Sequence, residues 1–389
     1  MWLLELNQYQ LINTDSRNLE LGQIFLALKG ANFDGHDFIE QALDAGAQLV
    51  YSEQEHQDSR VKQVDNCLKQ YHRLANEYRN LIDPIVIGIT GSAGKTTAKE
   101  LLAAILSEKY KVHYTQANFN NEIGVPKTIL SMPVDTEVLI LEMGMRGLGE
   151  IDLLSKTAEP NIALITNIGT AHIERLGSRE NIKKAKLEIL SGLKDHALVV
   201  ADQKLTQELE GQFKLISFEA QSQNEPAEPK YLISEGLLAS IDACSKIAQQ
   251  LTLSEQEITA GLKKFSPGRG RGDFVQIDEN IFIDETYNSN PEALRNSVKA
   301  LIERFPDDHK YALVGDINES EAELIEQVFA EIKKLENDKF KLLDARGLEA
   351  KAAQELLRAQ LSSDKNIILV KASRSAKFEE VLTSLCSSG

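Results

Sequence analysis

From Ile85 onward, two patterns of hydrophobic and polar positions alternate along the chain. Short, almost continuously apolar runs, such as residues 85–89 and 138–141, are separated by stretches in which apolar residues recur every three or four positions. The first pattern is typical of buried parallel strands, and the second of amphipathic helices that cover them. The pattern therefore predicts a doubly wound α/β domain, with ligands at the carboxyl ends of its strands.

The residues before Ile85 have a different pattern. A short strand-like piece, "QIFLAL" (23–28), precedes a helix-like segment, "HDFIEQALDAGAQLVY" (36–51), and a polar helical stretch over residues 64–81. Asp83-Pro84 ends that stretch, because the residue before a proline disfavours helical geometry. We therefore expect a small N-terminal α/β domain over residues 1–83.

A second boundary is predicted at the glycine-rich segment "SPGRGRGDF" (266–274). Beyond it, strand patterns at residues 281–288, 310–316, 340–345 and 366–373 alternate with helical ones. At 389 residues the chain is too long for one ordinary core. We expect a central P-loop domain with a doubly wound parallel sheet over residues 84–267 and a Rossmann-like C-terminal α/β domain over 268–389.

The composition of the chain limits the classes of partner that it can bind. The chain carries 43 basic and 59 acidic residues, a formal charge of −16, which disfavours nucleic acid and anionic membrane surfaces. Its three cysteines are widely spaced, as in reduced thiols rather than zinc or disulfide sites. No apolar run approaches the roughly 20 residues that span a bilayer, and the N-terminus lacks a basic leader. We expect a cytoplasmic monomer without membrane insertion.

A short glycine-rich loop links the strand at 85–89 to a helical pattern. Its glycines let backbone N–H groups approach phosphate oxygens, Lys95 adds a full charge, and the Thr96 hydroxyl is suited to Mg²⁺. The alternative is an ordinary turn with a solvated lysine. The two glycines also lie closer together than in the usual G-x-x-x-x-G-K-[ST] loop. The expected nucleotide contacts are Gly91, Ser92, Ala93, Gly94, Lys95, Thr96 and Thr97.

Three further residues are candidates for metal chemistry. Glu142 ends an apolar strand, where a magnesium carboxylate lies in P-loop domains, although an ordinary loop acid fits as well. His172 follows the next strand and would suit a second divalent ion, yet a lone histidine is often a plain loop residue. Lys186 lies in an amphipathic helix, and the pattern alone favours a solvated lysine.

Two amide-rich segments leave two interpretations open. "NFNNEIGVP" (118–126) contains Asn118, Asn120 and Asn121 before a helical pattern, so these amides either bind a sugar or amide ligand or cap the helix. "DETYNSNP" (284–291), with Arg271 nearby, brings an arginine, an aspartate and amides to the third domain, or is a charged linker.

Together the motifs resemble the Mur ligase family, ATP-dependent amide-bond-forming enzymes of peptidoglycan assembly whose P-loop has the short T-G-x-x-G-K-T form. The segments that carry the resemblance are "TGSAGKTTAKE", "NFNNEIGVP", "EMGMRGLGEI", "ITNIGTAHIERLGS", "KAKLEIL" and "IDETYNSNP". The segment "TDSRNLELGQIFLALKG" is similar to the family's UDP-sugar-binding domain. The "NFNNEIGVP" and "YNSNP" forms favour the branch whose substrates are UDP-N-acetylmuramoyl-tripeptide and D-alanyl-D-alanine.

The resemblance implies a role for each candidate. Lys95 and Thr96 would hold ATP and Mg²⁺, Glu142 and His172 would bind two Mg²⁺ ions, and Lys186 would be carbamylated to bridge them. Lys95, His172 and Lys186 are thereby the expected catalytic residues. The resemblance further implies Arg271, Asp284 and Asn288 as nucleotide contacts, and Thr14, Asp15, Ser16 and Arg17 as part of the uridine-nucleotide site. Asn118, Asn120 and Asn121 are the other expected substrate-binding residues.

The chain also departs from the family pattern in its C-terminal part. "KASR" replaces K-G-S-R, and "VGDINESEAE" stands where the family has G-D-M-x-E-L-G. These changes leave two alternatives open: a ligase with a different amine acceptor, and a non-catalytic nucleotide-binding scaffold. A scaffold would not need the complete predicted metal set.

Overall fold

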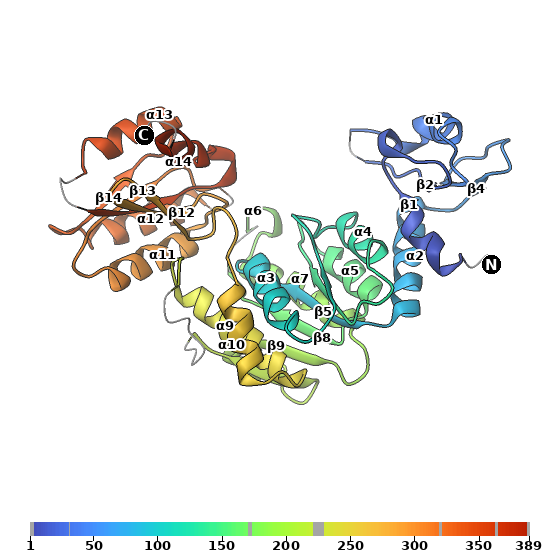
Figure 1. Cartoon of the computed structure of the whole chain (residues 1–389), viewed down its shortest axis with the longest axis horizontal. Helices are drawn as coiled ribbons and strands as arrows, with labels where there is room; N and C mark the ends of the chain where they lie inside the picture. The colour runs from blue at the N-terminus through green and yellow to red at the C-terminus, as the bar shows by residue number, and fades with distance from the viewer. Residues whose placement is uncertain are drawn as a thin grey trace.

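Three successive β-sheets form the chain (Figure 1). The computed structural model describes residues 4–30, 32–169, 173–220, 229–318, 321–361 and 365–386. Two of the sheets are parallel throughout and the third contains one antiparallel pair. The α/β class predicted from the sequence is therefore confirmed.

The N-terminal sheet is small and parallel, with strand order β1-β2-β3-β4. Its elements are η1 (Leu6–Leu11), β1 (Ile12–Asn13), η2 (Ser16–Asn18), β2 (Ile24–Leu26), η3 (Gly35–Phe38), α1 (Ile39–Asp44), β3 (Leu49–Ser52) and β4 (Val61–Gln63). The helix-like reading of residues 36–51 was wrong at its end, because α1 stops at Asp44 and Leu49–Ser52 is a strand. Gly46, at φ 88°, takes the left-handed conformation that ends many helices.

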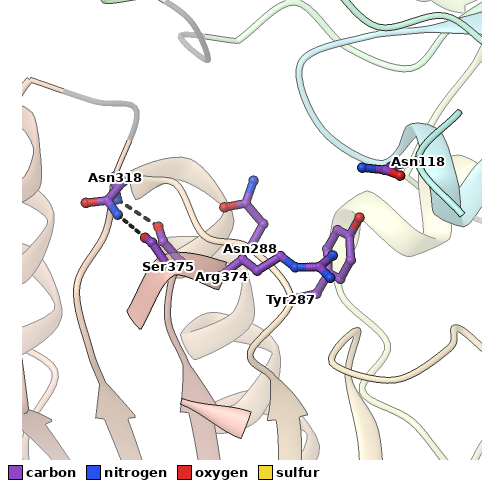
Figure 2. A pocket seen from close by; sticks show the side chains of 7 residues that line it. Asn118, Tyr287, Asn288, Asn318, Arg374 and Ser375 are labelled. Atoms are coloured by element: carbon purple, nitrogen blue, oxygen red, sulfur yellow. Dashed lines mark hydrogen bonds between the residues drawn. The ribbon is translucent and has the colours of Figure 1, made fainter. Parts of the chain in front are cut away.

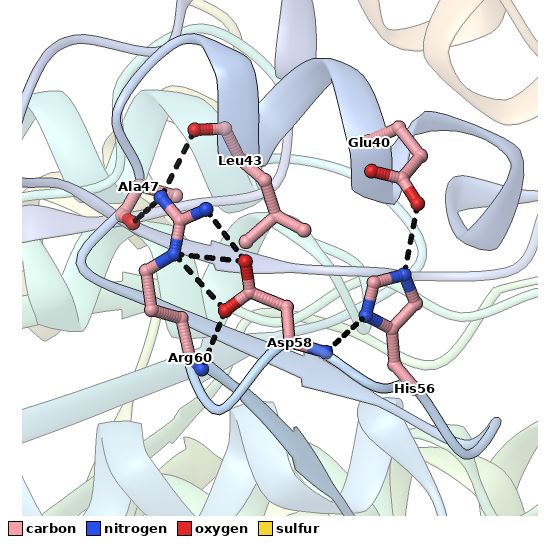
Figure 3. A network of polar contacts seen from close by, with 6 residues as sticks. All are labelled: Glu40, Leu43, Ala47, His56, Asp58 and Arg60. Atoms are coloured by element: carbon pink, nitrogen blue, oxygen red, sulfur yellow. Dashed lines mark hydrogen bonds and ion pairs between the residues drawn. The ribbon is translucent and has the colours of Figure 1, made fainter.

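The connection between β3 and β4 is fastened to α1 by polar contacts (Figure 3). The Arg60 guanidinium pairs with Asp58 at 2.7 Å and donates to the Leu43 carbonyl at 3.1 Å. His56 accepts from the Asp58 backbone N–H, and its other ring nitrogen lies 3.0 Å from a Glu40 carboxylate oxygen. These contacts hold a connection that has few apolar residues of its own.

Helix α2 (Cys67–Ile82) joins the first sheet to the second and packs against both. The Tyr78 hydroxyl donates to the Met132 carbonyl at 2.6 Å, and the Arg79 guanidinium, which is fully buried, donates to the Glu159 carbonyl at 3.1 Å. Asp83, in the left-handed conformation, ends the helix before Pro84. The first sheet is thus attached to the central one through a buried helix.

The central sheet is parallel throughout, with strand order β10-β9-β8-β5-β7-β6. Its strands are β5 (Ile85–Thr90), β6 (Val112–Tyr114), β7 (Val138–Glu142), β8 (Ile162–Ile165), β9 (Leu198–Asp202) and β10 (Lys214–Phe218). Its helices are α3 (Lys95–Leu106), α4 (Gly124–Leu130), α5 (Glu150–Ala158), α6 (Ile173–Leu176), α7 (Arg179–Leu187), η4 (Glu188–Gly192), α8 (Gln203–Glu208), α9 (Glu235–Gln250) and α10 (Glu255–Lys264).

Both faces of this sheet are buried, as its continuous apolar runs predict. Alternate residues of β5 point to opposite cores: Val86 lies in one cluster with α2 and α5, while Ile87 and Ile89 lie in another with α3, α9 and α10. The chain leaves β5 toward β7 and β6 on one side and returns to β8 on the other. Such a switch point at the carboxyl end of β5 is where doubly wound sheets bind ligands.

The third sheet has strand order β11-β12-β15-β13-β14. Its elements are β11 (Asp273–Ile277), β12 (Asn280–Glu285), α11 (Pro291–Arg304), β13 (His309–Val314), α12 (Ala322–Lys333), β14 (Phe340–Asp344), α13 (Ala350–Arg358), β15 (Asn366–Lys371), η5 (Arg374–Ala376) and α14 (Glu379–Cys386). Strand β11, which the sequence pattern did not reveal, forms an antiparallel hairpin with β12. No helix in the described ranges has the length and apolar character needed to cross a membrane.

Candidate active site

The glycine-rich loop lies at the carboxyl end of β5, as predicted. Gly91 has φ 152° and packs so tightly that a Cβ there would lie 1.9 Å from Thr166 Oγ1. Gly94, at φ 78°, is the residue before α3, so the loop turns directly into a helix N-terminus. Lys95 Nζ donates to the Gly91 carbonyl at 2.7 Å and therefore folds back over the loop. This arrangement places a helix dipole and an ammonium group at one point, as anion binding requires.

Glu142, at the end of the neighbouring strand β7, contacts the same loop. The Thr96 hydroxyl donates to one Glu142 carboxylate oxygen at 2.8 Å, and the Asn120 side-chain amide donates to the other at 2.8 Å. The carboxylate is buried, with 2% of the residue exposed. A hydroxyl and a carboxylate at adjoining strand ends form the hard oxygen donor set that Mg²⁺ prefers.

Lys186 is buried, in contrast to the pattern-based expectation of a solvated side chain. It lies in α7 with none of its surface exposed, and within the described ranges its Nζ has no hydrogen-bond partner. Burial, and secondarily the Lys95 charge, lowers the pKa of its ammonium group to about 7. A buried amine with a substantial neutral fraction near pH 7 is chemically suited to reaction with carbon dioxide, so the residue fits the carbamate that the resemblance implies.

Asn167 is a site residue to which the sequence assigned no role. It follows β8, the strand on the other side of β5, and its Oδ1 accepts from the backbone N–H groups of Ser92 and Ala93 at 3.0 and 2.9 Å. It therefore fixes the shape of the loop from a third strand end. The sequence could have indicated Asn167, because the residue directly follows an apolar run that predicts a strand of the same sheet.

The three amides of the "NFNNEIGVP" segment have different partners. Asn121 Oδ1 accepts from the Gly124 N–H at 2.9 Å and so caps the start of α4. Asn120 holds Glu142, while Asn118 lines a cavity that faces the C-terminal sheet. Asn121 thus has the helix-capping role, while ligand binding by Asn118 stays a prediction.

The cavity lies between the Asn118 loop and the C-terminal sheet, and it has a volume of about 330 Å³. Figure 2 shows Arg374 extending across Tyr287, with Asn318 hydrogen-bonded to Ser375 on the far side. The complete lining is Asn118, Tyr287, Asn288, Asn318, Ser373, Arg374 and Ser375. It combines one arginine with amides and hydroxyls, a lining suited to a small polar ligand that carries a negative group.

The predicted nucleotide contacts of the third domain lie close to this cavity. Asn288 is in its lining, and Arg271 lies against Tyr287, with its Cζ 4.0 Å from the ring centre. Asp284 is buried and accepts from the Thr286 N–H and hydroxyl at 3.1 and 2.6 Å. The hairpin of β11 and β12 brings Arg271 and Asp284 to the same end of the sheet, because Asp273 pairs with Asp284.

The predicted UDP contacts form a turn of the first domain that includes Thr14 and Ser16. Asp15 caps η2, and Arg17 binds it through two bonds of 2.8 and 2.7 Å. The Arg17 hydrogen bonds lower the pKa of the Asp15 carboxyl to about 2. The Arg17 charge is therefore already paired with Asp15.

The predicted metal set consists of Thr96, Glu142, His172 and Lys186. Of these residues, His172 lies outside the described part of the chain. Across the described ranges no group of three or more His, Cys, Asp or Glu side chains forms a metal-binding cluster. The predicted set differs from such a cluster, because it draws a hydroxyl from Thr96 and a modified lysine at position 186.

Comparison with known proteins finds similar sequences over nearly the whole chain. A model described as "Mur ligase middle domain" matches residues 89–248, and one described as "Mur ligase family, catalytic domain" matches residues 8–110. UDP-N-acetylmuramoyl-tripeptide–D-alanyl-D-alanine ligase of Bacillus subtilis (strain 168) is 32% identical, covering 97% of this chain and 93% of that protein. The protein of the same name from Synechocystis sp. is 40% identical over 79% of this chain and 72% of its own length.

Solved structures of similar proteins have the same fold as this chain. The MurF ligase from Thermotoga maritima in complex with ADP is 27% identical, with a TM-score of 0.87 over 99% of each chain. MurF from Acinetobacter baumannii is also 27% identical, with a TM-score of 0.84 over 97% of this chain and 93% of that chain. Taken with the sequence matches over nearly the whole length, these similarities show that the chain belongs to the Mur ligase family.

Proposed function

We propose that the protein is an ATP-dependent ligase that joins D-alanyl-D-alanine to UDP-N-acetylmuramoyl-tripeptide and releases ADP and phosphate. The observation that carries the proposal is the short P-loop whose Thr96 hydroxyl binds Glu142 at the adjoining strand end. Similarity to ligases of that name over nearly the whole chain supports the choice of substrates.

The reaction needs activation because a carboxylate is a poor acylating agent. Attack of the tripeptide carboxylate on the γ-phosphorus of ATP forms an acyl phosphate and releases ADP. The dipeptide amine then attacks the acyl carbon, loses a proton, and the tetrahedral intermediate expels phosphate. Phosphoryl transfer depends mainly on positioning and on neutralising charge, for which Lys95 and the α3 N-terminus are placed at the loop.

We infer a magnesium site at the same strand ends. Thr96 and Glu142 would hold an ion, and His172 and a carbamylated Lys186 would complete the site for two ions. When bound, Mg²⁺ supplies positive charge that offsets the negative charge of the phosphates. The supporting observations are the buried Thr96–Glu142 contact and the Lys186 amine, which has no hydrogen-bond partner among the described residues.

We infer that the cavity beside Arg374 receives the dipeptide. Its volume of about 330 Å³ is at the lower end of ordinary ligand pockets, as a molecule of dipeptide size requires. Arg374 would bind the dipeptide carboxylate through its guanidinium, which favours planar bidentate pairing. The amide of Asn118 is suited to the peptide group, and Asn118 belongs to the same loop as Asn120, which holds Glu142.

The turn at Thr14, Asp15, Ser16 and Arg17 would hold the uridine nucleotide. Its backbone is fixed by Asp15, whose side chain accepts from the Arg17 N–H at 3.1 Å. The sugar nucleotide would then run from the first sheet past the Asn118 loop toward Lys95.

The substrate assignment is tested by product mass with competing acceptors. The protein is incubated with ATP, Mg²⁺, UDP-N-acetylmuramoyl-tripeptide and an equimolar mixture of D-alanyl-D-alanine, D-alanine, L-lysine and meso-diaminopimelate. A UDP-muramoyl-pentapeptide as the dominant product supports the proposal. Preferential addition of a single amino acid would instead assign the pocket to a different amine, in line with the departures from the family pattern at Ile317 and Ala372.

A further inference from the structure

A buried ion pair joins the two strands whose ends lead into the cavity. Lys371 is the last residue of β15 and Glu285 the last residue of β12, and the two are paired across these neighbouring parallel strands. The Lys371 ammonium group lies 2.5 Å from a Glu285 carboxylate oxygen, with 5% and 13% of the two side chains exposed. The Ser297 hydroxyl of α11 lies 2.5 Å from the same oxygen. The Glu285 carboxylate thus holds its own strand to both β15 and α11.

Two segments that follow this ion pair form the C-terminal side of the cavity, and we call residues 286–290 and 372–375 the cavity walls. Tyr287 comes two residues after Glu285, and Arg374 comes three residues after Lys371. The walls touch, because the Arg374 Cζ is 5.2 Å from the centre of the Tyr287 ring (Figure 2). The first wall leads into α11, which the same carboxylate holds, so this wall is fastened at both ends.

Stability alone does not account for a buried ion pair at this place. Removing two charges from water costs about as much as their attraction returns, so apolar residues of similar volume would stabilise the sheet as well. Lys310, near the start of β13, provides a contrast at the opposite end of the same sheet. It is also buried, but its ammonium group donates to the backbone carbonyls of Phe305 and Asp308 at 2.6 and 2.7 Å. Only the first of these two buried lysines fixes strand ends that carry the cavity walls.

We propose that Lys371 and Glu285 are positioning residues that set the two cavity walls relative to each other and so hold Arg374 where it binds the carboxylate of the acceptor. This inference rests on the proposed function, which places the dipeptide beside Arg374. The dipeptide carboxylate is the end remote from the amine that reacts. Displacing Arg374 therefore weakens acceptor binding and leaves the chemical step largely intact, which raises KM more than it lowers kcat.

The test is steady-state kinetics with D-alanyl-D-alanine varied and with ATP, Mg²⁺ and UDP-N-acetylmuramoyl-tripeptide at saturation. The double variant Lys371→Met/Glu285→Leu replaces the ion pair by an apolar pair, and the Ser297 hydroxyl keeps its contact with the Ala293 carbonyl at 2.8 Å. We expect the KM for the dipeptide to rise about 10-fold or more, the scale of one lost charge-assisted hydrogen bond. We expect kcat to stay within about 2-fold of the wild-type value.

Denaturant unfolding of the same variants separates positioning from stability. The double variant should keep an unfolding free energy close to wild type, because the apolar pair leaves no buried charge without a partner. Lys310→Met is the matched control, a buried lysine of the same sheet away from the cavity. Its effect should fall on the free energy of unfolding and not on the dipeptide KM. Glu285→Gln, which removes one charge at nearly constant shape, should also raise that KM and replaces the double variant if the latter fails to bind the UDP substrate.

An unchanged dipeptide KM in both variants of the ion pair would overturn the positioning role. An equal rise in Lys310→Met, or a loss confined to kcat, would overturn it as well. Wild-type protein that forms no UDP-muramoyl-pentapeptide with the dipeptide would overturn the proposed function and the inference with it. The two failures are thus distinguishable.

Discussion

Lys186 owes its chemical character to burial rather than to a charged partner. The residue is fully buried, and burial lowers the pKa of its amine to about 7. Desolvation disfavours the charged form of a lysine, so a large neutral fraction exists near pH 7, and a neutral amine is the form that can be carbamylated. The hydrophobic pattern could not reveal this, because it marks a lysine as polar wherever the residue lies.

Lys186→Ala should therefore lose nearly all ligase activity, and acetate or formate should restore part of it by supplying the missing carboxylate. The measurement is phosphate release as a function of added carboxylate. Lys184→Ala, on the exposed side of the same helix, is the matched control and should keep wild-type activity without added carboxylate. Full activity of Lys186→Ala without rescue would show that the lysine carries no metal-bridging group.

Lys95→Ala should lower ATP turnover by about 10²-fold or more, the usual cost of removing one preorganised group that stabilises transition-state charge. Binding of the UDP substrate, measured by calorimetry, should remain close to wild type, because Lys95 lies at the P-loop and not at the Asp15 turn. Lys109→Ala, an exposed lysine just beyond the same helix, is the control. Undiminished turnover in Lys95→Ala would remove the P-loop assignment.

At the scale of elements, the strand-to-helix turn after β5 was the part of the site most open to prediction. Strand, glycines, Lys95-Thr96 and helix follow one another in the sequence, and all were found in place. Asn167 was harder to foresee, since its contact with the loop depends on β8 lying beside β5. Strand β11 was missed because its pairing with β12 is a hairpin outside the alternating strand–helix pattern.

Gly91→Ala should weaken ATP binding about 10-fold or more, because strained backbone costs on the order of 1–3 kcal/mol and the new methyl group would meet Thr166 Oγ1 at 1.9 Å. Gly147→Ala is the matched control, since a Cβ there has only a Glu150 carboxylate oxygen nearby, at 3.5 Å. ATP binding is measured by calorimetry. Equal affinity in both variants would mean that the tight turn at Gly91 does not shape the phosphate site.

The contact of α2 with α5 predicts a pH-dependent stability. His72 is buried at this contact, its Nδ1 lies 2.6 Å from Thr157 Oγ1, and burial lowers its pKa from 6.5 to about 4. Below pH 6.5 the unfolded state binds the proton more readily than the folded state, so stability present above that pH is lost as pH falls toward 4. The contribution is roughly 3 kcal/mol at most.

Denaturant unfolding at pH 7.5 and pH 5.0 measures this effect. His72→Gln should show a smaller loss of unfolding free energy between the two pH values than the wild-type protein. If both proteins lose the same amount, His72 titrates with an ordinary pKa and the burial argument is wrong.

For the whole molecule, the sequence indicated a chain divided into α/β units, and the structure has three sheets in that order. Alternating strands and helices are local signals, so they can be read from the chain. The cavity between the Asn118 loop and the C-terminal sheet could not be predicted in this way. It forms only where segments 200 residues apart, at Asn118 and Asn318, approach each other.

The central claim is that ATP cleavage is joined to amide-bond formation between two substrates held on different sheets. The most direct test is phosphate release from ATP with Mg²⁺ and UDP-N-acetylmuramoyl-tripeptide, with and without D-alanyl-D-alanine. We predict sustained release only when both substrates are present, with one phosphate for each UDP-muramoyl-pentapeptide formed. Sustained release that does not depend on the dipeptide, or no release with any acceptor, would contradict the assignment of the protein as this ligase.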